Sequence, residues 1–134
     1  MRVFLDTNVL VSAFATRGVC EELFRYVLAQ HSLVTGEVVL AELERILRDR
    51  FGLPAETIEE ALRILHSFPV VPRPETPSPI PVRDEDDSWV LASALAGQAE
   101  VLVTGDKDLL DLRAEAGIQI LNPRDFLSRM GQIS

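Results

Sequence analysis

The stretch RVFLD, residues 2–6, is a short apolar run that ends at an acid. It predicts a buried strand, because strands that are covered on both faces are apolar at nearly every position. Similar runs follow at Ser32–Thr35 (SLVT), Glu100–Thr104 (EVLVT) and Ile118–Leu121 (IQIL). Helical spacing of apolar residues fills the intervals between these runs. Strands that alternate with helices predict an α/β fold with a mainly parallel sheet.

The clearest predicted helix is Val38–Arg50, where the apolar positions fall on one face of the helical wheel. Further helices are predicted from residue 8 onward, at 18–29, after Pro54, from the acidic run at 84–87 to residue 97, after residue 106, and at 124–130. The segment from Pro69 to Pro81 holds six prolines and predicts an extended surface connection. Because only two predicted strands follow it, we interpret the segment as a connection within a single domain spanning residues 1–134.

Composition narrows the class of protein. The chain has 134 residues, 47% of them hydrophobic, and a net charge of −8. No apolar run approaches the length that spans a bilayer, and the single cysteine excludes an internal disulfide. We therefore expect a cytoplasmic protein without a membrane partner. The negative charge argues against binding nucleic acid over the whole surface, unless the carboxylates are concentrated at one site.

Acids follow two of the predicted strands. Asp6 ends the first strand, and Asp106 comes just after the strand Glu100–Thr104. The carboxyl ends of parallel strands form the ligand crevice of open α/β sheets, so these two acids can be neighbours. Asp84, Asp86 and Asp87 begin a helix beside the same edge. Ionised carboxylates that share a crevice repel one another, and a hard divalent cation such as Mg²⁺ or Mn²⁺ offsets that repulsion. Such a cation also promotes phosphodiester cleavage.

Four segments, in this order and spacing, resemble the PIN domain: Asp6-Thr7-Asn8-Val9-Leu10, Ala41-Glu42-Leu43, Asp84-Glu85-Asp86-Asp87 followed by Val90-Leu91-Ala92, and Thr104-Gly105-Asp106-Lys107-Asp108-Leu109-Leu110. The resemblance is greatest to small bacterial PIN proteins that are toxins of toxin–antitoxin pairs, similar to VapC. It implies a three-layer α/β/α domain with a mainly parallel sheet of four to five strands. It also implies a Mg²⁺- or Mn²⁺-dependent endoribonuclease, an RNA substrate, a homodimer and a small antitoxin partner. The residues implied to be catalytic are Asp6, Glu42, Asp87 and Asp106, with Asp84 and Asp108 as further metal ligands and Asn8 and Thr104 in support.

Some of these positions have simpler interpretations. Asp6-Thr7-Asn8 is also a good helix cap, and acids in the first turn of a helix are stabilised by its dipole. Periodicity does not choose between Glu42 and Glu44, although Arg48 at i+4 gives Glu44 a sufficient surface partner. The register favours Asp87 over Asp84, the expected N-cap, as the main third ligand, while Asp108 is an outer ligand or a cap.

Two other functions remain open from the sequence. A Mg²⁺-dependent phosphatase would use Asp6 as a covalent nucleophile, but that chemistry commonly needs a second acid at the position of Asn8. A non-catalytic interaction domain would use the acids only to bind metal or a phosphoryl group. Metal binding without turnover of nucleic acid would distinguish the second case.

Overall fold

The computed structural model describes residues 1–78, 80–112 and 116–130, so Pro79, residues 113–115 and residues 131–134 of the predicted domain lie outside the described residues. Five parallel strands form one sheet in the order β3-β2-β1-β4-β5. The strands are β1 (Arg2–Leu5), β2 (Ser32–Gly36), β3 (Val70–Val71), β4 (Val101–Val103) and β5 (Gln119–Leu121). The predicted α/β fold with a parallel sheet is confirmed, whereas the single-domain organisation over residues 1–134 stays a prediction.

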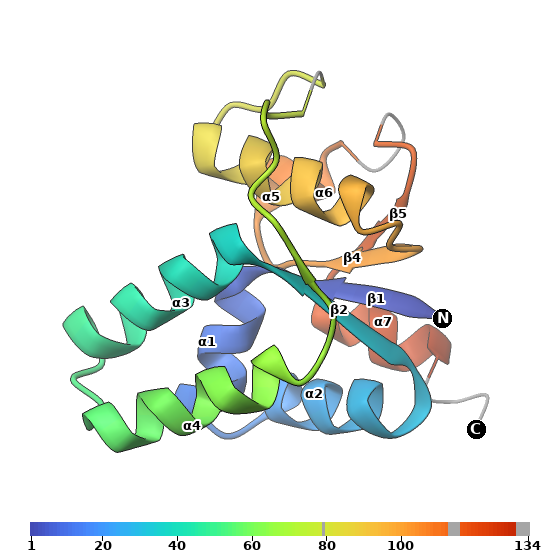
Figure 1. Ribbon diagram of the computed structural model, residues 1–134. Coiled ribbons are helices and arrows are strands. Elements are labelled where there is room, and N and C mark those ends of the chain that lie inside the picture. Colours follow the sequence, from blue (N-terminus) through green and yellow to red (C-terminus); the bar gives the residue numbers. More distant parts are fainter. Residues whose placement is uncertain (79, 113–115, 131–134) are drawn as a thin grey trace.

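Helices cover both faces of this sheet (Figure 1). α5 and α6 lie on one face, and α1, α2 and α7 lie on the other, with α3 and α4 toward the β3 edge. This is the expected three-layer α/β/α arrangement. The helices are α1 (Thr7–Ala15), α2 (Val19–Gln30), α3 (Glu37–Asp49), α4 (Ala55–His66), α5 (Glu85–Ala96), α6 (Lys107–Leu110) and α7 (Pro123–Met130).

The core lies on both sides of the three central strands. Val3, Phe4 and Leu5 of β1 have no exposed surface, and neither do the three residues of β4. Because both faces are covered, these strands are apolar at every buried position, which is why their sequences show no alternation. The chain runs from β1 toward one edge of the sheet and then returns to β4 on the other side of β1. The gap between the ends of β1 and β4 is therefore the topological switch point, where open α/β sheets bind ligands.

The proline-rich segment differs from its prediction as a purely surface connection. It contributes strand β3, in which Val70 and Val71 pair with Thr35 and Gly36 of β2. Pro69 and Pro72 flank this strand and limit it to two residues, since proline has no N–H for the ladder. Ser78, further along, is buried against α5, and its N–H donates to the carbonyl of Ser88 at 3.2 Å.

None of the helices in the described ranges combines the length and the apolar character needed to cross a bilayer.

Candidate metal centre

Asp6 lies between the end of β1 and the start of α1. Leu5 pairs with Val103 of β4, and the Asp6 N–H continues the ladder by donating to the Val103 carbonyl at 2.9 Å. The carboxylate of Asp6 caps α1, with Oδ1 accepting from the Thr7 N–H at 2.7 Å. The expected helix cap is thus present. It also fixes the Asp6 carboxylate, which is only 3% exposed, at the switch point of the sheet.

Thr104 and Asn8 connect Asp6 to the end of β4. The Thr104 hydroxyl donates to Asp6 Oδ2 at 2.7 Å and accepts from the Asp106 N–H at 3.0 Å. The Asn8 side chain donates to the same Asp6 oxygen at 3.1 Å, and its Oδ1 accepts from the Gly105 N–H at 3.2 Å. Thr104 and Asn8 therefore fix the position of Asp6, after β1, relative to the segment that carries Asp106, after β4. Residues that hydrogen-bond metal ligands orient them in this way.

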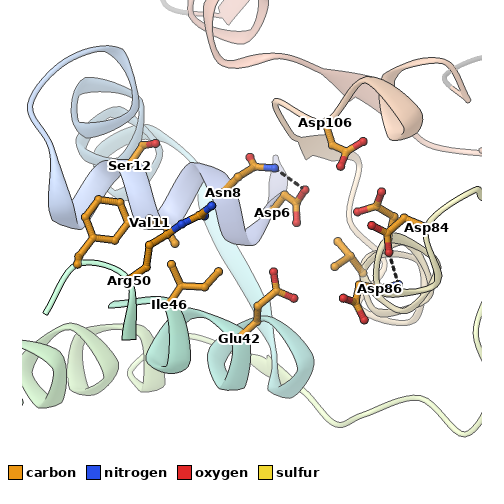
Figure 2. Close-up of a pocket in the computed structure, with 13 residues that line it drawn as sticks. Asp6, Asn8, Val11, Ser12, Glu42, Ile46, Arg50, Asp84, Asp86 and Asp106 are labelled. Carbon is orange, nitrogen blue, oxygen red and sulfur yellow. Dashed lines mark hydrogen bonds between the residues drawn. The ribbon is translucent and has the colours of Figure 1, made fainter. Parts of the chain in front are cut away.

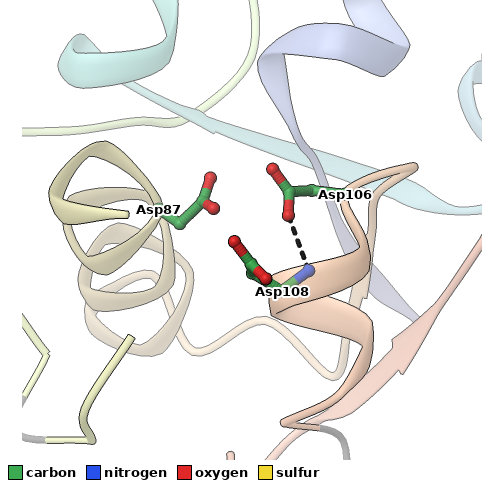
Figure 3. A group of neighbouring side chains, drawn as sticks. All are labelled: Asp87, Asp106 and Asp108. Carbon is green, nitrogen blue, oxygen red and sulfur yellow. Dashed lines mark hydrogen bonds between the residues drawn. The ribbon is translucent and has the colours of Figure 1, made fainter. Parts of the chain in front are cut away.

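Asp87, Asp106 and Asp108 form a second group of carboxylates that point toward one another (Figure 3). One oxygen from each lies within 4.8 Å of the others. Asp106 caps α6 by accepting from the Asp108 N–H at 2.8 Å. Asp87 comes from the first turn of α5 and is 7% exposed, and its buried Oδ2 has no hydrogen-bond partner among the described residues.

The residues that the sequence offered as alternatives differ in their surroundings. Glu42 on α3 is half-buried and faces the acids, as Figure 2 shows, whereas Glu44 is exposed and lies 3.9 Å from Arg48. Asp84 is the N-cap of α5, accepting from the Asp86 N–H at 2.9 Å, and its side chain is exposed at the rim.

These side chains surround a cavity of about 350 Å³ (Figure 2). Six carboxylates line it: Asp6, Glu42, Asp84, Asp86, Asp87 and Asp106. The other lining residues are Asn8, Val11, Ser12, Ile46, Arg50, Phe51 and Val90. In the described part of the chain, none of the six carboxylates forms an ion pair with a basic side chain.

Burial, together with the neighbouring acids, raises the pKa of three of these carboxyl groups. Burial, with the charges of Asp106 and Asp6, raises the pKa of Asp87 to about 8. Burial also raises the pKa of Asp6, although the hydrogen bonds from Thr104 and Thr7 oppose that rise. The pKa of Glu42 is raised by burial and then by the charges of Asp6 and Asp86. Without a cation, these shifts favour the protonated form of each of the three groups.

The donor set fits a hard divalent cation. Carboxylate oxygens are the ligands that Mg²⁺ and Mn²⁺ prefer, and a buried carboxylate oxygen without a partner needs a cation or a proton. Asp6, Asp87 and Asp106 converge at the switch point. Asp87 and Asp106 also belong to the group of three carboxylates that includes Asp108. These residues could hold one or two ions, with Glu42 and Asp84 on the cavity wall.

Every residue named from the sequence lies at or directly beside this cavity. Asp108 and Thr104 are the two that do not line it. Asp86, Ser12, Arg50 and Phe51 line it and were not among the predicted site residues. Helical periodicity could have indicated Arg50, because it follows Glu42 by eight residues and shares a face with Ile46.

Comparisons with known proteins agree with this fold. Residues 2–108 match the PIN domain. The structure resembles a chain of VapBC2 from Rickettsia felis, solved bound to a DNA fragment from their promoter, with a TM-score of 0.65, 16% identity and coverage of 91% of this chain and 98% of that chain. It also resembles a PilT N-terminus domain protein from the hyperthermophilic archaeon Sulfolobus solfataricus P2, with a TM-score of 0.60, 13% identity and coverage of 96% and 92%.

At these identities the two likenesses show the fold alone, and no curated protein matches the sequence. The match to the PIN domain, however, extends over most of the chain, from the strand before Asp6 to Asp108. The chain therefore belongs to the PIN-domain family.

Proposed function

We propose that this PIN-domain protein is a nuclease that uses Mg²⁺ or Mn²⁺ to cleave phosphodiester bonds in single-stranded RNA. The observation that carries the proposal is the convergence of Asp6, Asp87 and Asp106 from β1, α5 and β4 on one cavity. None of the three forms an ion pair with a basic side chain of the described residues, and Asp87 Oδ2 has no hydrogen-bond partner among them. A divalent cation bound by these residues would supply positive charge at the site.

Each carboxylate has a distinct task in this proposal. Hydrogen bonds from Thr7, Asn8 and Thr104 fix the orientation of the Asp6 carboxylate, which would be a metal ligand. One oxygen of Asp87 lies within 4.8 Å of one oxygen of Asp106, and these two carboxylates would supply the other oxygens. A bound divalent ion would lower the pKa of a water molecule and stabilise the negative charge that develops on the phosphate oxygens.

Glu42 is the candidate general base. It stands on the α3 wall, opposite the strand ends, and its raised pKa makes its carboxylate a stronger base near neutral pH. In this role it accepts the proton of the attacking water while the new P–O bond forms and the bond to the leaving ribose oxygen breaks.

The geometry argues against the phosphatase alternative. A nucleophilic aspartate needs an accessible oxygen with a free lone pair directed at the phosphorus. Asp6 is 3% exposed, and both of its oxygens already accept hydrogen bonds, Oδ2 from two donors. Such a carboxylate suits a metal ligand better than a covalent nucleophile.

We further propose that the protein acts as the toxin of a toxin–antitoxin pair, with a small antitoxin partner and a homodimeric assembly. The resemblance of its motifs to VapC supports this role, as does the fold shared with a chain of VapBC2. A small open reading frame immediately upstream of the gene, whose product copurifies with this chain and suppresses its toxicity, is the expected finding.

The test of the enzymatic proposal is cleavage of single-stranded RNA with added Mg²⁺ or Mn²⁺. We expect wild-type activity that EDTA removes, and at least a hundredfold loss in Asp6→Asn. The control is Asp111→Asn, which makes the same change of charge at an exposed position outside the cavity. Undiminished cleavage by Asp6→Asn contradicts the proposal, and metal binding without any cleavage supports the non-catalytic alternative.

A further inference from the structure

The cavity has two chemically different ends. The acidic end is assigned above to the cation and the scissile phosphate. The other end, between α1 and the end of α3, is lined by Val11, Ser12, Ile46, Arg50 and Phe51. An aromatic ring and a guanidinium beside apolar side chains are the groups that proteins use to hold a nucleotide of a single strand.

The chain reversal after α3 places Phe51 at this end. The N–H groups of Arg50 and Phe51 both donate to the Ile46 carbonyl, at 2.9 and 3.3 Å. Gly52 then adopts φ 59°, a left-handed conformation that other residues rarely take, and the chain turns toward α4. The turn holds Phe51 at the cavity wall with 42% of its surface exposed, although a phenylalanine gains more by burial.

Arg50 offers an uncommitted positive charge. Arg48, two residues earlier, is engaged by Glu44 and Asp49 at 3.9 and 3.1 Å, whereas Arg50 forms no ion pair with any described residue. In Figure 2 the Arg50 side chain extends along α1 toward Asn8 and the acidic end. A second hollow shares Ile46 and Arg50 with the cavity and is also lined by Arg45 and Asp49. Asp49 is paired with Arg48, whereas Arg45 forms no ion pair within the described residues.

We propose that Arg50 and Phe51 form a nucleotide-binding subsite next to the acidic end. The Phe51 ring stacks on the base of a nucleotide that flanks the scissile phosphate, and the Arg50 guanidinium binds the next phosphate along the strand. The inference rests on the proposed function, because it takes RNA as the substrate. The cavity volume of about 350 Å³ lies within the range of small-ligand sites, which begins at about 300 Å³.

The subsite has two consequences for the choice of substrate. Stacking on an aromatic ring requires an open base face, so the strand must be unpaired at this position. Because every base has a π-face, the subsite tolerates any base, and sequence preference has to come from other contacts. Arg50 also explains how a chain with a net charge of −8 binds RNA, because it supplies local positive charge beside the acids.

Steady-state cleavage of an unpaired RNA at saturating Mg²⁺ tests the role of Phe51. We expect Phe51→Ala to raise KM about tenfold with little change in kcat, and Phe51→Tyr to restore KM to near the wild-type value. The matched control is Ile64→Ala, which truncates a 37% exposed apolar side chain on α4 outside the cavity and should leave KM unchanged. Equal KM values for Phe51→Ala and Ile64→Ala overturn the proposal.

Binding of a fluorescein-labelled hexaribonucleotide tests Arg50 without turnover. The measurement uses Asp106→Asn protein with Mg²⁺, so that cleavage does not interfere. We expect Arg50→Gln to weaken binding and to reduce the slope of log affinity against log salt by about one, as the loss of one phosphate contact does. The control Arg63→Gln, on an exposed face of α4, should change neither quantity. An unchanged slope in Arg50→Gln overturns the assignment of Arg50.

The two assays separate failure of the subsite from failure of the proposed function. If wild-type protein binds RNA but never cleaves it, the nuclease proposal fails, and the affinity ratios of Phe51→Ala and Arg50→Gln still support or overturn the subsite. If cleavage occurs and neither variant differs from its control, the nuclease proposal stands and the subsite is overturned. If the wild-type protein with Mg²⁺ neither binds nor cleaves the RNA, both proposals are overturned.

Discussion

Replacing Asp87 by asparagine is expected to stabilise the metal-free protein at alkaline pH. Asp87 is 7% exposed, faces Asp106 and Asp6, and has an oxygen without a partner. Its pKa is about 8 in the folded protein against an ordinary value of 3.8. A carboxyl group whose pKa is raised by folding contributes stability at low pH, and this contribution is lost as the pH rises through about 8. Asparagine has nearly the same shape and cannot ionise, so the Asp87→Asn protein does not lose stability in this way as the pH rises.

The size of the effect follows from the pH range in which Asp87 is protonated in the folded protein and ionised in the unfolded chain. Between pH 5 and pH 8, about three pH units, the folded protein keeps this proton and the unfolded chain has lost it. At about 1.4 kcal/mol per unit, the free energy of unfolding therefore falls by at most about 4 kcal/mol. Water that enters the open cavity screens the repulsion and lowers this ceiling. We therefore expect the free energy of unfolding of Asp87→Asn to exceed that of the wild type by about 2 kcal/mol more at pH 8 than at pH 5.

Urea unfolding in EDTA at both pH values measures this difference. Asp111→Asn is the control, because it removes the same charge at an exposed site and should change stability by less than about 0.5 kcal/mol. Saturating Mn²⁺ should reverse the order of stability, since only the wild type keeps the full ligand set. An equal gain for Asp87→Asn at pH 5 and pH 8, or a gain no larger than that of Asp111→Asn, refutes the reasoning.

Three further predictions concern the parts that support the site. Thr104→Ala should lower the free energy of unfolding by about 1–3 kcal/mol and weaken Mn²⁺ binding about 10- to 100-fold, because Asp6 loses a buried hydrogen bond, while Thr104→Ser should retain both in urea and calorimetric titrations. Gly97→Ala should cost about 1–3 kcal/mol in urea unfolding, since its Cβ would lie 2.7 Å from the nearest β3 side-chain atom, at the end of α5. Glu42→Gln should slow RNA cleavage about 100-fold, whereas the exposed Glu44→Gln should leave turnover unchanged.

The fold could be predicted from the sequence because its central strands are short runs rich in apolar residues, and amphipathic helices separate these runs. Strand β3 could not, since Val70 and Val71 form a two-residue strand with prolines on either side. A run this short carries no periodicity, and its pairing with Thr35 and Gly36 depends on a contact over more than thirty residues. The burial of Ser78 depends in the same way on where α5 packs.

The candidate site was predictable to different degrees for different residues. Asp6 and Asp106 follow strands, so topology alone brings them to one edge of the sheet. Glu42 could be distinguished from Glu44 only through the family resemblance, because both lie at the border of the apolar face of α3. Phe51 was missed because it follows the helix, where periodicity no longer applies and the turn at Gly52 decides its direction.

Direct measurement of Mn²⁺ binding by electron paramagnetic resonance tests the central claim, that the carboxylates at the ends of β1 and β4 and on α5 form a metal site. The account predicts saturable binding to the wild type, and at least tenfold weaker binding to Asp106→Asn, with Asp111→Asn unchanged. Mn²⁺ affinity that is the same in Asp106→Asn and the wild type, or that falls equally in Asp111→Asn, would contradict it.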